Sequence, residues 1–426
     1  MPGPVRFVLT TNSPGEVSGW LTPVVAALRE RYPAAAIHVF LPPCDFASGA
    51  EAEVVRSIAG IDGVWRPREY LRFALAGLGP PGLPRRGAGA VIFLGGDLIH
   101  AVLLSRRLGL PAFAYTEGFA RWSGSFRRFF LPDRLAREKA IRRYGAPAAK
   151  LEIVGNLMVD AVHRALAAAT AAALPPGLAE GNFVVLLPGS RPPEFRQVFG
   201  LFLRAAARLA LPAVVLLSPF ISWRVAEEVL KASRGRPDRF LYPVGGVLGP
   251  APAELALPAE TGSESRLLVT DDGRVLPVYR APAAIRYQLM ARARAALCLP
   301  GTNTLEMATL GLPAVVALPL QRPDLIPLPG LAGILGRLPG AGRFIRKAVV
   351  EREAARRQWL ALPNLIFNGP LLPEVRGRVT PQTLADALEK LLAEEPGWRR
   401  ARLREVAGPA GAAARLVEAI ARELQL

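Results

Sequence analysis

The pattern of apolar and polar positions along the chain predicts short buried strands that alternate with helices. In the first half it places strands at Val5–Thr10, Ala36–Leu41, Gly63–Trp65, Ala90–Leu94, Pro111–Tyr115 and Leu151–Val154. In the second half it places strands at Val184–Leu187, Ala213–Leu217, Ala295–Leu299 and Ala314–Leu318. Helices are expected between them, and Asp272–Gly273 is typical of a hairpin turn. Such alternation predicts parallel sheets covered by helices on both faces.

The length of the chain and the order of these segments predict two α/β domains. A chain of 426 residues exceeds the usual size of a single core, and the alanine-rich segment 165–182 is typical of a helix running into a linker. We therefore expect an N-terminal domain over residues 1–170 and a C-terminal domain over 180–385. Residues 386–426 are expected to form helices, interrupted at Glu395–Gly397, that can pack back on the N-terminal domain.

Composition narrows the class of protein. Hydrophobic residues make up 51% of the chain and charged residues 21%, which favours large cores and argues against disorder. No uninterrupted apolar run approaches the length of about 18 residues that spans a membrane, so we expect no transmembrane helix. The first strand begins almost at the N-terminus, which argues against a signal peptide. Cys44 and Cys298 lack metal-site spacing and suit a reducing cytoplasm.

The formal net charge of +18 indicates an anionic partner. No helix-turn-helix, zinc-finger spacing or aromatic RNA-binding signature is evident, so we expect no specific nucleic acid. Residues 68–86 have an apolar centre between arginines, and residues 324–347 are apolar and glycine-rich with a basic end. Both patterns suit the headgroup layer of an anionic membrane. We expect peripheral attachment to the inner face of the cell membrane; the alternative is a solvated basic surface.

The segment LPGSRPPE follows a buried strand and opens a helical pattern that continues from Phe195. A helix that starts after a small-residue turn directs free backbone N–H groups and the positive end of its dipole at an anion. Arg191 adds a planar, permanently charged group that suits phosphate. We therefore expect Gly189, Ser190 and Arg191 to bind a diphosphate, with Glu194 either orienting Arg191 or facing solvent. The alternative is an ordinary strand-to-helix connection.

A second strand, Ala295–Leu299, ends in another small polar turn. Gly301, Thr302, Asn303 and Thr304 precede a helix, and the last three are good N-cap types. Glu306 lies in the first turn of this helix. It can accept hydrogen bonds from a ribose diol while the turn holds a diphosphate, or it can simply balance the helix dipole.

Five segments, in this order, resemble the lipid-A-disaccharide synthase family of inverting GT-B glycosyltransferases. PGEVSGW resembles its Gly-Glu-x-Ser-Gly-Asp turn, and FLGGDLIH its Asp-x-Pro-Asp loop. LPGSRPPE resembles Pro-Gly-Ser-Arg, PGTNTLEMATLGLPAVV resembles Ser-Gly-Thr-x-x-Leu-Glu with the following strand, and LPNLIFNGPLLPE resembles Leu-Pro-Asn-Leu with a downstream Pro-Glu. VGNLMVDAV is similar to Gly-His-Pro-x-x-Asp. The resemblance spans nearly the whole chain.

Departures from the family pattern lie in the N-terminal half. Trp20 and His100 stand where the family has aspartates, Asn156 stands where it has histidine, and the aromatic Ser-x-x-Trp-Ala-Trp region is reduced to TEGFARWSGSFRR. In the family this half binds the acceptor. The departures therefore leave the nucleotide-sugar interpretation intact and the acceptor open.

The resemblance implies a GT-B fold, with two doubly wound, Rossmann-like α/β domains facing a cleft. The N-terminal domain would bind the acceptor and the C-terminal domain the nucleotide sugar. The implied reaction joins UDP-2,3-diacylglucosamine to 2,3-diacylglucosamine 1-phosphate through a β-linkage and releases UDP, with no metal or other cofactor. Alternatives are a different lipid acceptor, a UDP-N-acetylglucosamine 2-epimerase, or a non-catalytic protein that binds UDP-sugar or nucleic acid.

Inverting transfer needs a base that takes the proton of the acceptor hydroxyl. Asp97 follows the strand Ala90–Leu94 and matches the family's first loop aspartate, so it is the candidate base; its alternative role is the N-cap of the next helix. His100 is a weaker substitute. The first-turn residues expected to contact sugar or acceptor, unless they cap the first helix, are Gly15, Glu16, Ser18 and Gly19. Asn364 follows a proline and either bridges the phosphates or caps a turn.

Overall fold

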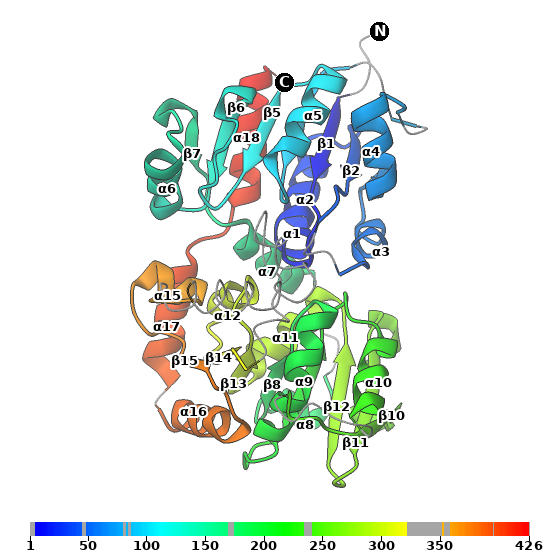
Figure 1. Ribbon diagram of the computed structural model, residues 1–426, viewed down its shortest axis with the longest axis vertical. Helices are drawn as coiled ribbons and strands as arrows, with labels where there is room; N and C mark the ends of the chain where they lie inside the picture. The colour runs from blue at the N-terminus through cyan, green and yellow to red at the C-terminus, as the bar shows by residue number, and fades with distance from the viewer. Residues whose placement is uncertain are drawn as a thin grey trace. The chain divides into compact units, whose positions relative to one another are not determined.

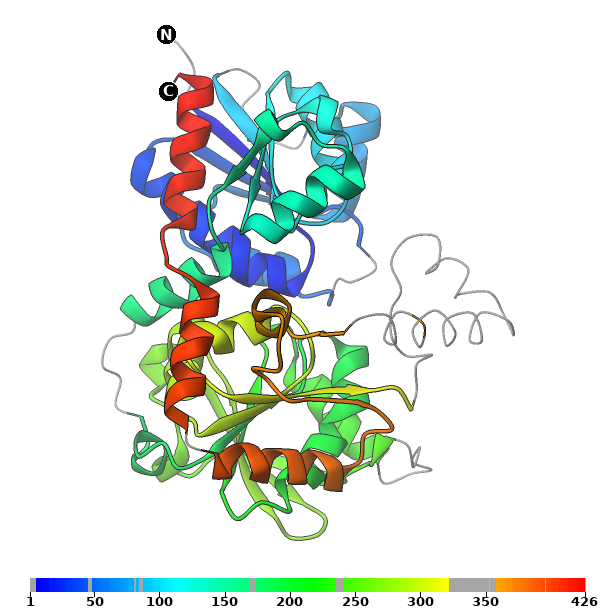
Figure 2. The ribbon, with the colours of Figure 1, turned by 90° about the vertical axis from the view of Figure 1, so that its left-hand side faces the viewer.

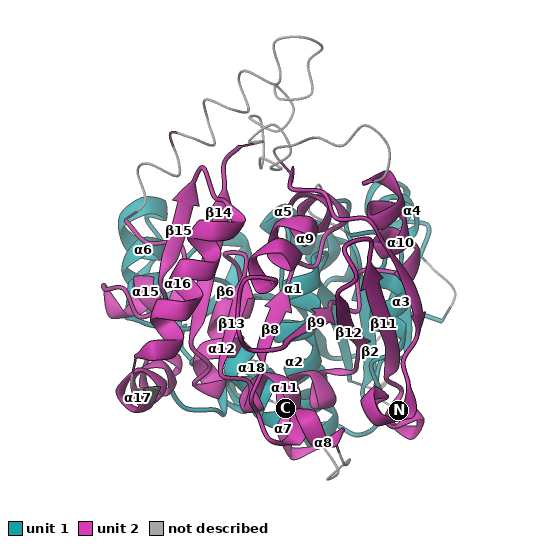
Figure 3. Ribbon diagram, turned by 90° about the horizontal axis from the view of Figure 1, so that it is seen from below, with its two compact units in different colours: residues 1–164, 408–426 teal, residues 165–407 magenta. Residues whose placement is uncertain are grey.

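The computed structural model describes residues 5–44, 48–79, 82–83, 87–168, 174–233, 241–321, 352, 358–394 and 396–425 of the chain. These residues fall into two compact units, each built around its own sheet (Figure 1, Figure 3). Residues 1–164 and 408–426 form the first unit, and residues 165–407 form the second.

The sheet of the first unit has seven parallel strands in the order β3-β2-β1-β4-β5-β6-β7. The strands are β1 (Arg6–Thr10), β2 (Ala36–Phe40), β3 (Gly63–Trp65), β4 (Gly89–Phe93), β5 (Ala112–Tyr115), β6 (Phe126–Leu131) and β7 (Leu151–Ile153). The chain runs outwards from β1 and then crosses to β4 on its other side. Ligands of doubly wound sheets bind beside such a reversal of strand order, at the carboxyl ends of the strands.

Helices of the first unit connect these strands. They are α1 (Pro14–Glu16), the π-helix η1 (Val17–Leu21), α2 (Thr22–Arg31), α3 (Glu51–Arg56), α4 (Pro67–Ala76), α5 (Leu98–Leu108), the 3₁₀ turns η2 (Ser123–Ser125) and η3 (Ala148–Lys150), α6 (Arg134–Tyr144) and α7 (Leu157–Ala167). A core of strand residues such as Val8, Val91 and Phe129 packs against α4, α5 and α6.

The last helix, α18 (Ala412–Leu424), returns to the first unit and packs against α2 (Figure 2). Asp160 of α7 accepts hydrogen bonds from the backbone N–H groups of Gly411 and Ala413, both at 2.6 Å, and so caps the start of α18. Helix α17 (Pro396–Ala407) belongs to the second unit. The helical pattern therefore breaks at residues 408–411 as well as near 395, because Gly408, Pro409 and Gly411 are poor helix formers.

The sheet of the second unit has eight strands in the order β10-β11-β12-β9-β8-β13-β14-β15. They are β8 (Val184–Leu187), β9 (Ala213–Leu217), β10 (Gly246–Pro250), β11 (Glu264–Thr270), β12 (Val275–Arg280), β13 (Ala295–Cys298), β14 (Ala314–Pro319) and β15 (Glu374–Gly377). The six neighbouring strands β12, β9, β8, β13, β14 and β15 run parallel to one another. The direction in which the chain adds strands to the sheet reverses between β8 and β13. Strands β10 and β11 add an antiparallel edge, with the predicted hairpin turn at Asp272–Gly273.

Helices cover both faces of the second sheet. They are α8 (Pro176–Ala179), α9 (Pro192–Ala206), α10 (Trp223–Ala232), α11 (Ala283–Arg292), α12 (Asn303–Leu310), α15 (Leu362–Phe367), α16 (Pro381–Ala393) and α17, with 3₁₀ turns η5 (Ala253–Leu255) and η6 (Ala259–Thr261). Alternate strand residues such as Leu186, Leu297 and Val315 form one core with α9 and α16. Cys298 and Val316 belong to the opposite face, where α12 lies.

Two doubly wound α/β units were predicted, and the sheet topologies confirm them. Three strands were not predicted. In β6 two arginines interrupt the apolar run, β10 is rich in glycine, and β15 is short and polar. None of the described helices has the length and apolar character needed to cross a membrane. Of the two segments expected at a membrane, 324–347 lies outside the described residues, as do positions 80–81 and 84–86 of the other.

Candidate functional site

The two turns singled out in the C-terminal half lie side by side at the strand reversal of the second unit. Strands β8 and β13 are paired, with Leu187 opposite Cys298, so the turns that follow them start at the same height. A Cβ atom built on Gly189 would lie 3.1 Å from Leu299 Cδ1, and Gly189 has a φ of +97°. Only glycine adopts this backbone conformation easily while leaving room for the second turn.

Arg191 occupies the N-cap position of α9 and keeps its backbone extended there. Its Nη1 donates to Glu194 Oε1 over 2.7 Å, and both side chains are about one quarter exposed. Glu194 therefore orients Arg191, which was one of its two expected roles. Gly189 and Ser190 are half-buried beside this pair. The turn combines a fixed guanidinium with the N-terminus of a long helix, which is an arrangement that suits an anion.

The second turn presents some residues outwards and turns one inwards. Gly301 is exposed, and Thr302 and Asn303 are half-buried, whereas Thr304 is fully buried. Thr302 has helical backbone angles and makes no side-chain cap, in contrast to its expected capping role. Thr304 Oγ1 instead donates to the carbonyl of Gly301 over 2.7 Å, which closes the turn on itself.

Glu306 is buried at the first turn of α12 and has two partners on α11. Tyr287 donates its hydroxyl to Glu306 Oε1 over 3.0 Å, and Arg286 Nη2 lies 3.3 Å from the same oxygen. Burial alone would lower the pKa of Arg286, but Glu306 and Tyr287 raise it above its ordinary value. The cation compensates a buried carboxylate that can still accept hydrogen bonds from a diol. No motif in the sequence pointed to Arg286 or Tyr287.

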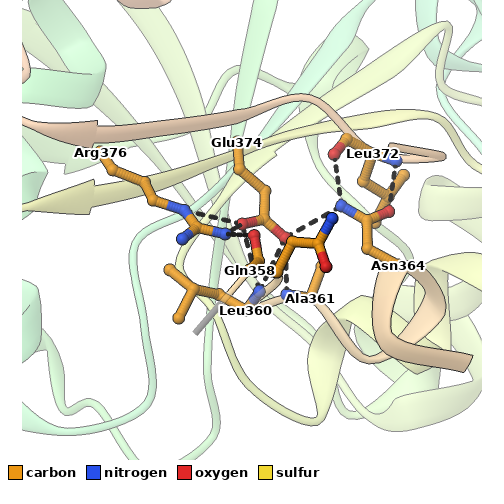
Figure 4. Close-up of polar contacts among 7 residues, drawn as sticks. All are labelled: Gln358, Leu360, Ala361, Asn364, Leu372, Glu374 and Arg376. Carbon is orange, nitrogen blue, oxygen red and sulfur yellow. Dashed lines mark hydrogen bonds and ion pairs between the residues drawn. The ribbon is translucent and has the colours of Figure 1, made fainter. Parts of the chain in front are cut away.

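Glu374, at the start of β15, is a buried carboxylate that accepts hydrogen bonds from several donors (Figure 4). It ends the Pro-Glu part of the fifth motif but was not among the predicted site residues. It accepts hydrogen bonds from the backbone N–H groups of Leu360 and Ala361, from Asn364 Nδ2 and from Arg376 Nε, each at 2.9 Å. The strand register aligns Glu374 with Val316. Because Val316 is aligned with Cys298, and Cys298 with Leu187, the carboxylate lies in the row from which both turns depart.

Asn364 is fully buried within this network. Its Nδ2 donates to Leu372 O as well as to Glu374, and its Oδ1 accepts from Leu372 N, the two contacts with Leu372 each at 2.7 Å (Figure 4). Both amide hydrogens are therefore engaged, which favours its structural interpretation over a phosphate contact. The network reaches the second turn because Leu362 N donates to Thr304 Oγ1 over 3.2 Å.

The candidate base, Asp97, lies at the strand reversal of the first unit. Its Oδ1 accepts from Ile99 N over 3.0 Å, so the side chain is the N-cap of α5, and the residue is exposed. His100 Nδ1 lies 2.7 Å from the Tyr70 hydroxyl, with the two rings edge to face. Burial lowers the pKa of His100, and Asp97 opposes this shift. Catalysis by Asp97 stays a prediction.

The first-turn residues differ in what they can contact. Gly15, Glu16 and Ser18 are half-buried. Gly19 is buried against Met158, since a Cβ atom there would lie 2.0 Å from Met158 Cε, and so it faces the interior. Glu16 accepts from the backbone N–H groups of Asn12, Ser13 and Gly96, and burial raises its pKa to about 6. Trp20 packs edge-on against Tyr115.

Glu117, which was not among the predicted site residues, is an acidic residue that follows β5. Burial raises its pKa, and Lys139 opposes the shift. Lys139 Nζ donates to the carbonyl of Glu117 over 2.9 Å and lies 3.9 Å from the centre of the Phe119 ring. A carboxylate thus follows the carboxyl end of each of four strands: Glu16 follows β1, Asp97 follows β4, Glu117 follows β5 and Asp133 follows β6. This edge suits hydrogen bonding to hydroxyl groups and proton transfer.

Comparisons with known proteins identify the fold. No protein-family model and no curated protein matches the chain in sequence. Among solved structures, S. aureus MnaA in a co-structure with UDP has a TM-score of 0.59 at 12% identity, covering 99% of this chain and 97% of its own. UDP-GlcNAc 2-epimerase from Methanocaldococcus jannaschii, in complex with UDP-GlcNAc and UDP, has a TM-score of 0.52 at 12% identity, covering 98% and 100%. The enzyme from Neisseria meningitidis, bound to UDP-GlcNAc, has a TM-score of 0.52 at 10% identity with the same coverage.

The likeness extends over nearly the full length of both chains and confirms the predicted fold class: two Rossmann-like α/β domains of the GT-B type. At identities of 10–12%, the likeness establishes the fold but not the activity. Within the described part of the chain, no group of three or more His, Cys, Asp or Glu side chains is arranged to hold a metal ion.

Proposed function

We propose that this protein is a UDP-sugar-dependent inverting glycosyltransferase that acts on a lipid acceptor. The observation that carries the proposal is the meeting of two sequence-distant turns at the strand reversal of the second unit, with Arg191 on one turn and Glu306 on the helix that follows the other. A fixed cation and two helix N-termini suit a diphosphate, and a buried carboxylate suits a ribose diol. The solved relatives in complex with UDP and UDP-GlcNAc have the same fold and support this choice of ligand.

In the proposed reaction the second unit stabilises the leaving group. The oxygen of the acceptor hydroxyl attacks the anomeric carbon of the donor sugar, the bond from that carbon to the diphosphate breaks, and UDP leaves. Negative charge on the diphosphate is met by Arg191 and by the turns at Gly189–Ser190 and Gly301–Asn303. No metal is required in this scheme, because the cationic side chain and backbone N–H groups supply the compensation.

The first unit supplies the base. The acceptor proton would pass to Asp97, whose Oδ2 is not used in capping α5 and whose position is exposed. The resemblance to lipid-A-disaccharide synthases favours UDP-2,3-diacylglucosamine as donor and 2,3-diacylglucosamine 1-phosphate as acceptor. The changes at Trp20 and His100 lie in this unit and bear on the choice of acceptor.

A lipid acceptor requires contact with a membrane surface, and α4 suits this role. Leu71, Leu75 and Leu78 are 40%, 70% and 59% exposed, at spacings that place them along one side of the helix and its end. Arg68 and Arg72 are exposed beside them. Apolar side chains between arginines suit the headgroup layer of an anionic bilayer on the cytoplasmic side. Binding to phosphatidylglycerol vesicles should fall in Leu75→Asp relative to Leu135→Asp, a matched change at an exposed leucine of α6.

The direct test is UDP release from UDP-2,3-diacylglucosamine with and without 2,3-diacylglucosamine 1-phosphate, in the wild type and in Asp97→Asn. Asparagine keeps the helix cap and removes the base. Release that requires the acceptor and is lost in Asp97→Asn would support the reaction and the base together. UDP binding without turnover on any lipid acceptor would leave a binding protein and contradict the transferase.

A second candidate, UDP-N-acetylglucosamine 2-epimerase, is favoured by the solved relatives of that name. Epimerisation needs groups that move protons at neutral pH, and burial raises the pKa values of Glu16 and Glu117. Incubation with UDP-N-acetylglucosamine alone, followed by NMR of the sugar ring, separates the two candidates. Appearance of the 2-epimer without an acceptor would favour the epimerase, and an unchanged substrate would favour the transferase.

A further inference from the structure

The turns that follow β1 and β4 meet at the strand reversal of the first unit, and strand pairing ends just before them. The last ladder bond runs from Leu94 N to Thr10 O over 2.8 Å. Beyond it, the turn of residues 11–16 and the turn of residues 95–97 need another link to keep a fixed relative position. The second of these turns carries the candidate base, Asp97.

Glu16 supplies that link with both carboxylate oxygens. Its Oε2 accepts from Asn12 N and Ser13 N in its own turn, over 3.3 and 3.2 Å. Its Oε1 accepts from Gly96 N of the other turn, over 3.3 Å. The two oxygens therefore serve two different turns, and a carboxylate supplies both acceptors.

Two glycines allow the carboxylate to come this close. A Cβ atom on Gly95 would lie 2.1 Å from Glu16 Oε2, and one on Gly96 would lie 2.4 Å from Asn12 Nδ2. Gly96 also has a φ of +90°, which other residues rarely adopt. The sequence Gly95-Gly96-Asp97 is thus shaped around Glu16.

Helix capping alone does not account for this arrangement. Glu69 occupies the equivalent third position of α4, and its Oε2 accepts from Arg66 N over 2.8 Å in an ordinary capping box. Within the described residues, no donor from another turn reaches Glu69. Glu16 is half-buried, and desolvation of its carboxyl group raises its pKa to about 6, which makes the ionised form costly. Costly buried charges are typical of functional sites.

We propose that Glu16 is a positioning residue that holds the Gly95–Asp97 turn, and with it the carboxylate of Asp97, in place for the acceptor. The link to catalysis rests on the proposed function. The link between the two turns does not, since it is a property of the folded first unit.

Hydrogen exchange measured by mass spectrometry tests the link without any substrate. In Glu16→Ala and in the volume-conserving Glu16→Gln, amide exchange in peptides covering residues 94–99 should accelerate at least tenfold. The matched variants Glu69→Ala and Glu69→Gln should leave residues 94–99 unchanged. Exchange in this segment that is the same in Glu16→Ala as in the wild type would overturn the proposal.

Turnover tests the positioning role. In acceptor-dependent UDP release, Glu16→Gln should lower kcat at least tenfold and leave KM for the UDP-sugar within about twofold. Because Glu16 acts through Asp97, the double variant Glu16→Gln/Asp97→Asn should lose no more activity than Asp97→Asn alone. Losses that multiply would contradict this role. If the wild type showed no acceptor-dependent release of UDP, the proposed function would be contradicted. The hydrogen-exchange result would still decide whether Glu16 holds the turn.

Discussion

Asn364 Nδ2 donates a hydrogen bond to Glu374 Oε1 over 2.9 Å and ties α15 to the start of β15 (Figure 4). The same carboxylate receives the N–H groups of Leu360 and Ala361, and the adjacent Leu362 N reaches Thr304 of the second turn. A strand that begins more than 60 residues after that turn therefore helps to fix its shape. The bond is a structural element of the candidate nucleotide site and not a contact with the ligand.

Glu374→Gln should weaken UDP binding by roughly tenfold, because both oxygens of Glu374 accept hydrogen bonds and glutamine has only one acceptor. The amide NH₂ would then face a donor. Isothermal titration with UDP measures the effect. Glu227→Gln, which removes a partly exposed ion pair with Arg266, is the control and should bind UDP normally. Equal affinities in the wild type and Glu374→Gln would refute this account of the turn.

Arg191→Ala should reduce affinity for UDP by about 30-fold and affinity for uridine hardly at all. A charge-assisted hydrogen bond contributes about 2 kcal/mol, and uridine carries no phosphate to receive it. Titrations with both ligands give the comparison. A parallel loss of uridine binding would mean that Arg191 supports the fold of the turn rather than the diphosphate.

Glu306 should discriminate between ribose and deoxyribose. In the wild type, 2′-deoxy-UDP should bind about five- to tenfold more weakly than UDP, because one hydroxyl donor to the carboxylate is lost. In Glu306→Ala both nucleotides should bind equally weakly. Discrimination that persists in Glu306→Ala would assign recognition of the ribose to another group.

Asp160→Ala should weaken the attachment of α18 to the first unit. The two short hydrogen bonds to Gly411 N and Ala413 N would be lost, at a cost of about 2 kcal/mol for an N-cap with two bonded donors. Cleavage by a protease between residues 407 and 412 should accelerate accordingly. Asp133→Ala, which removes the N-cap of α6, should leave this cleavage unchanged.

Glu16 should make the protein less stable as the pH rises, which is opposite to the usual effect of a carboxylate. Burial raises its pKa from 4.5 to about 6, so the folded state binds the proton more tightly than the unfolded state. Its contribution is fully present below about pH 4.5 and is lost as the pH rises through about 6, a change of about 2 kcal/mol. Urea unfolding at pH 4.5 and pH 7.5 should show the wild type losing this amount relative to Glu16→Gln. A difference that grows in the opposite direction would contradict the burial argument.

The sequence by itself determined the fold class and the location of the two turns proposed to bind the nucleotide. Apolar runs of four to six residues, separated by helical patterns, suffice to predict parallel strands, because buried strands in such sheets are apolar on both faces. Local turn chemistry also predicted that LPGSR and PGTNT each open a helix. Strands β6 and β15 escaped prediction because their polar residues depend on distant partners: Arg128 pairs with Glu423 of α18, and Glu374 with the backbone of residues 360–361.

Only the tertiary structure decided which residues of the motifs could contact a ligand and which are engaged in contacts within the protein. Asn364, Thr304 and Gly19 matched positions in the motifs, yet their surroundings occupy them with internal contacts. No sequence motif indicated Arg286 and Tyr287, which are the partners of Glu306 in the structure. Glu16 was visible as a turn residue, but its link to Gly96 spans 80 residues. Local patterns report on neighbours along the chain, whereas burial and hydrogen-bond partners depend on segments that meet only when the sheets assemble.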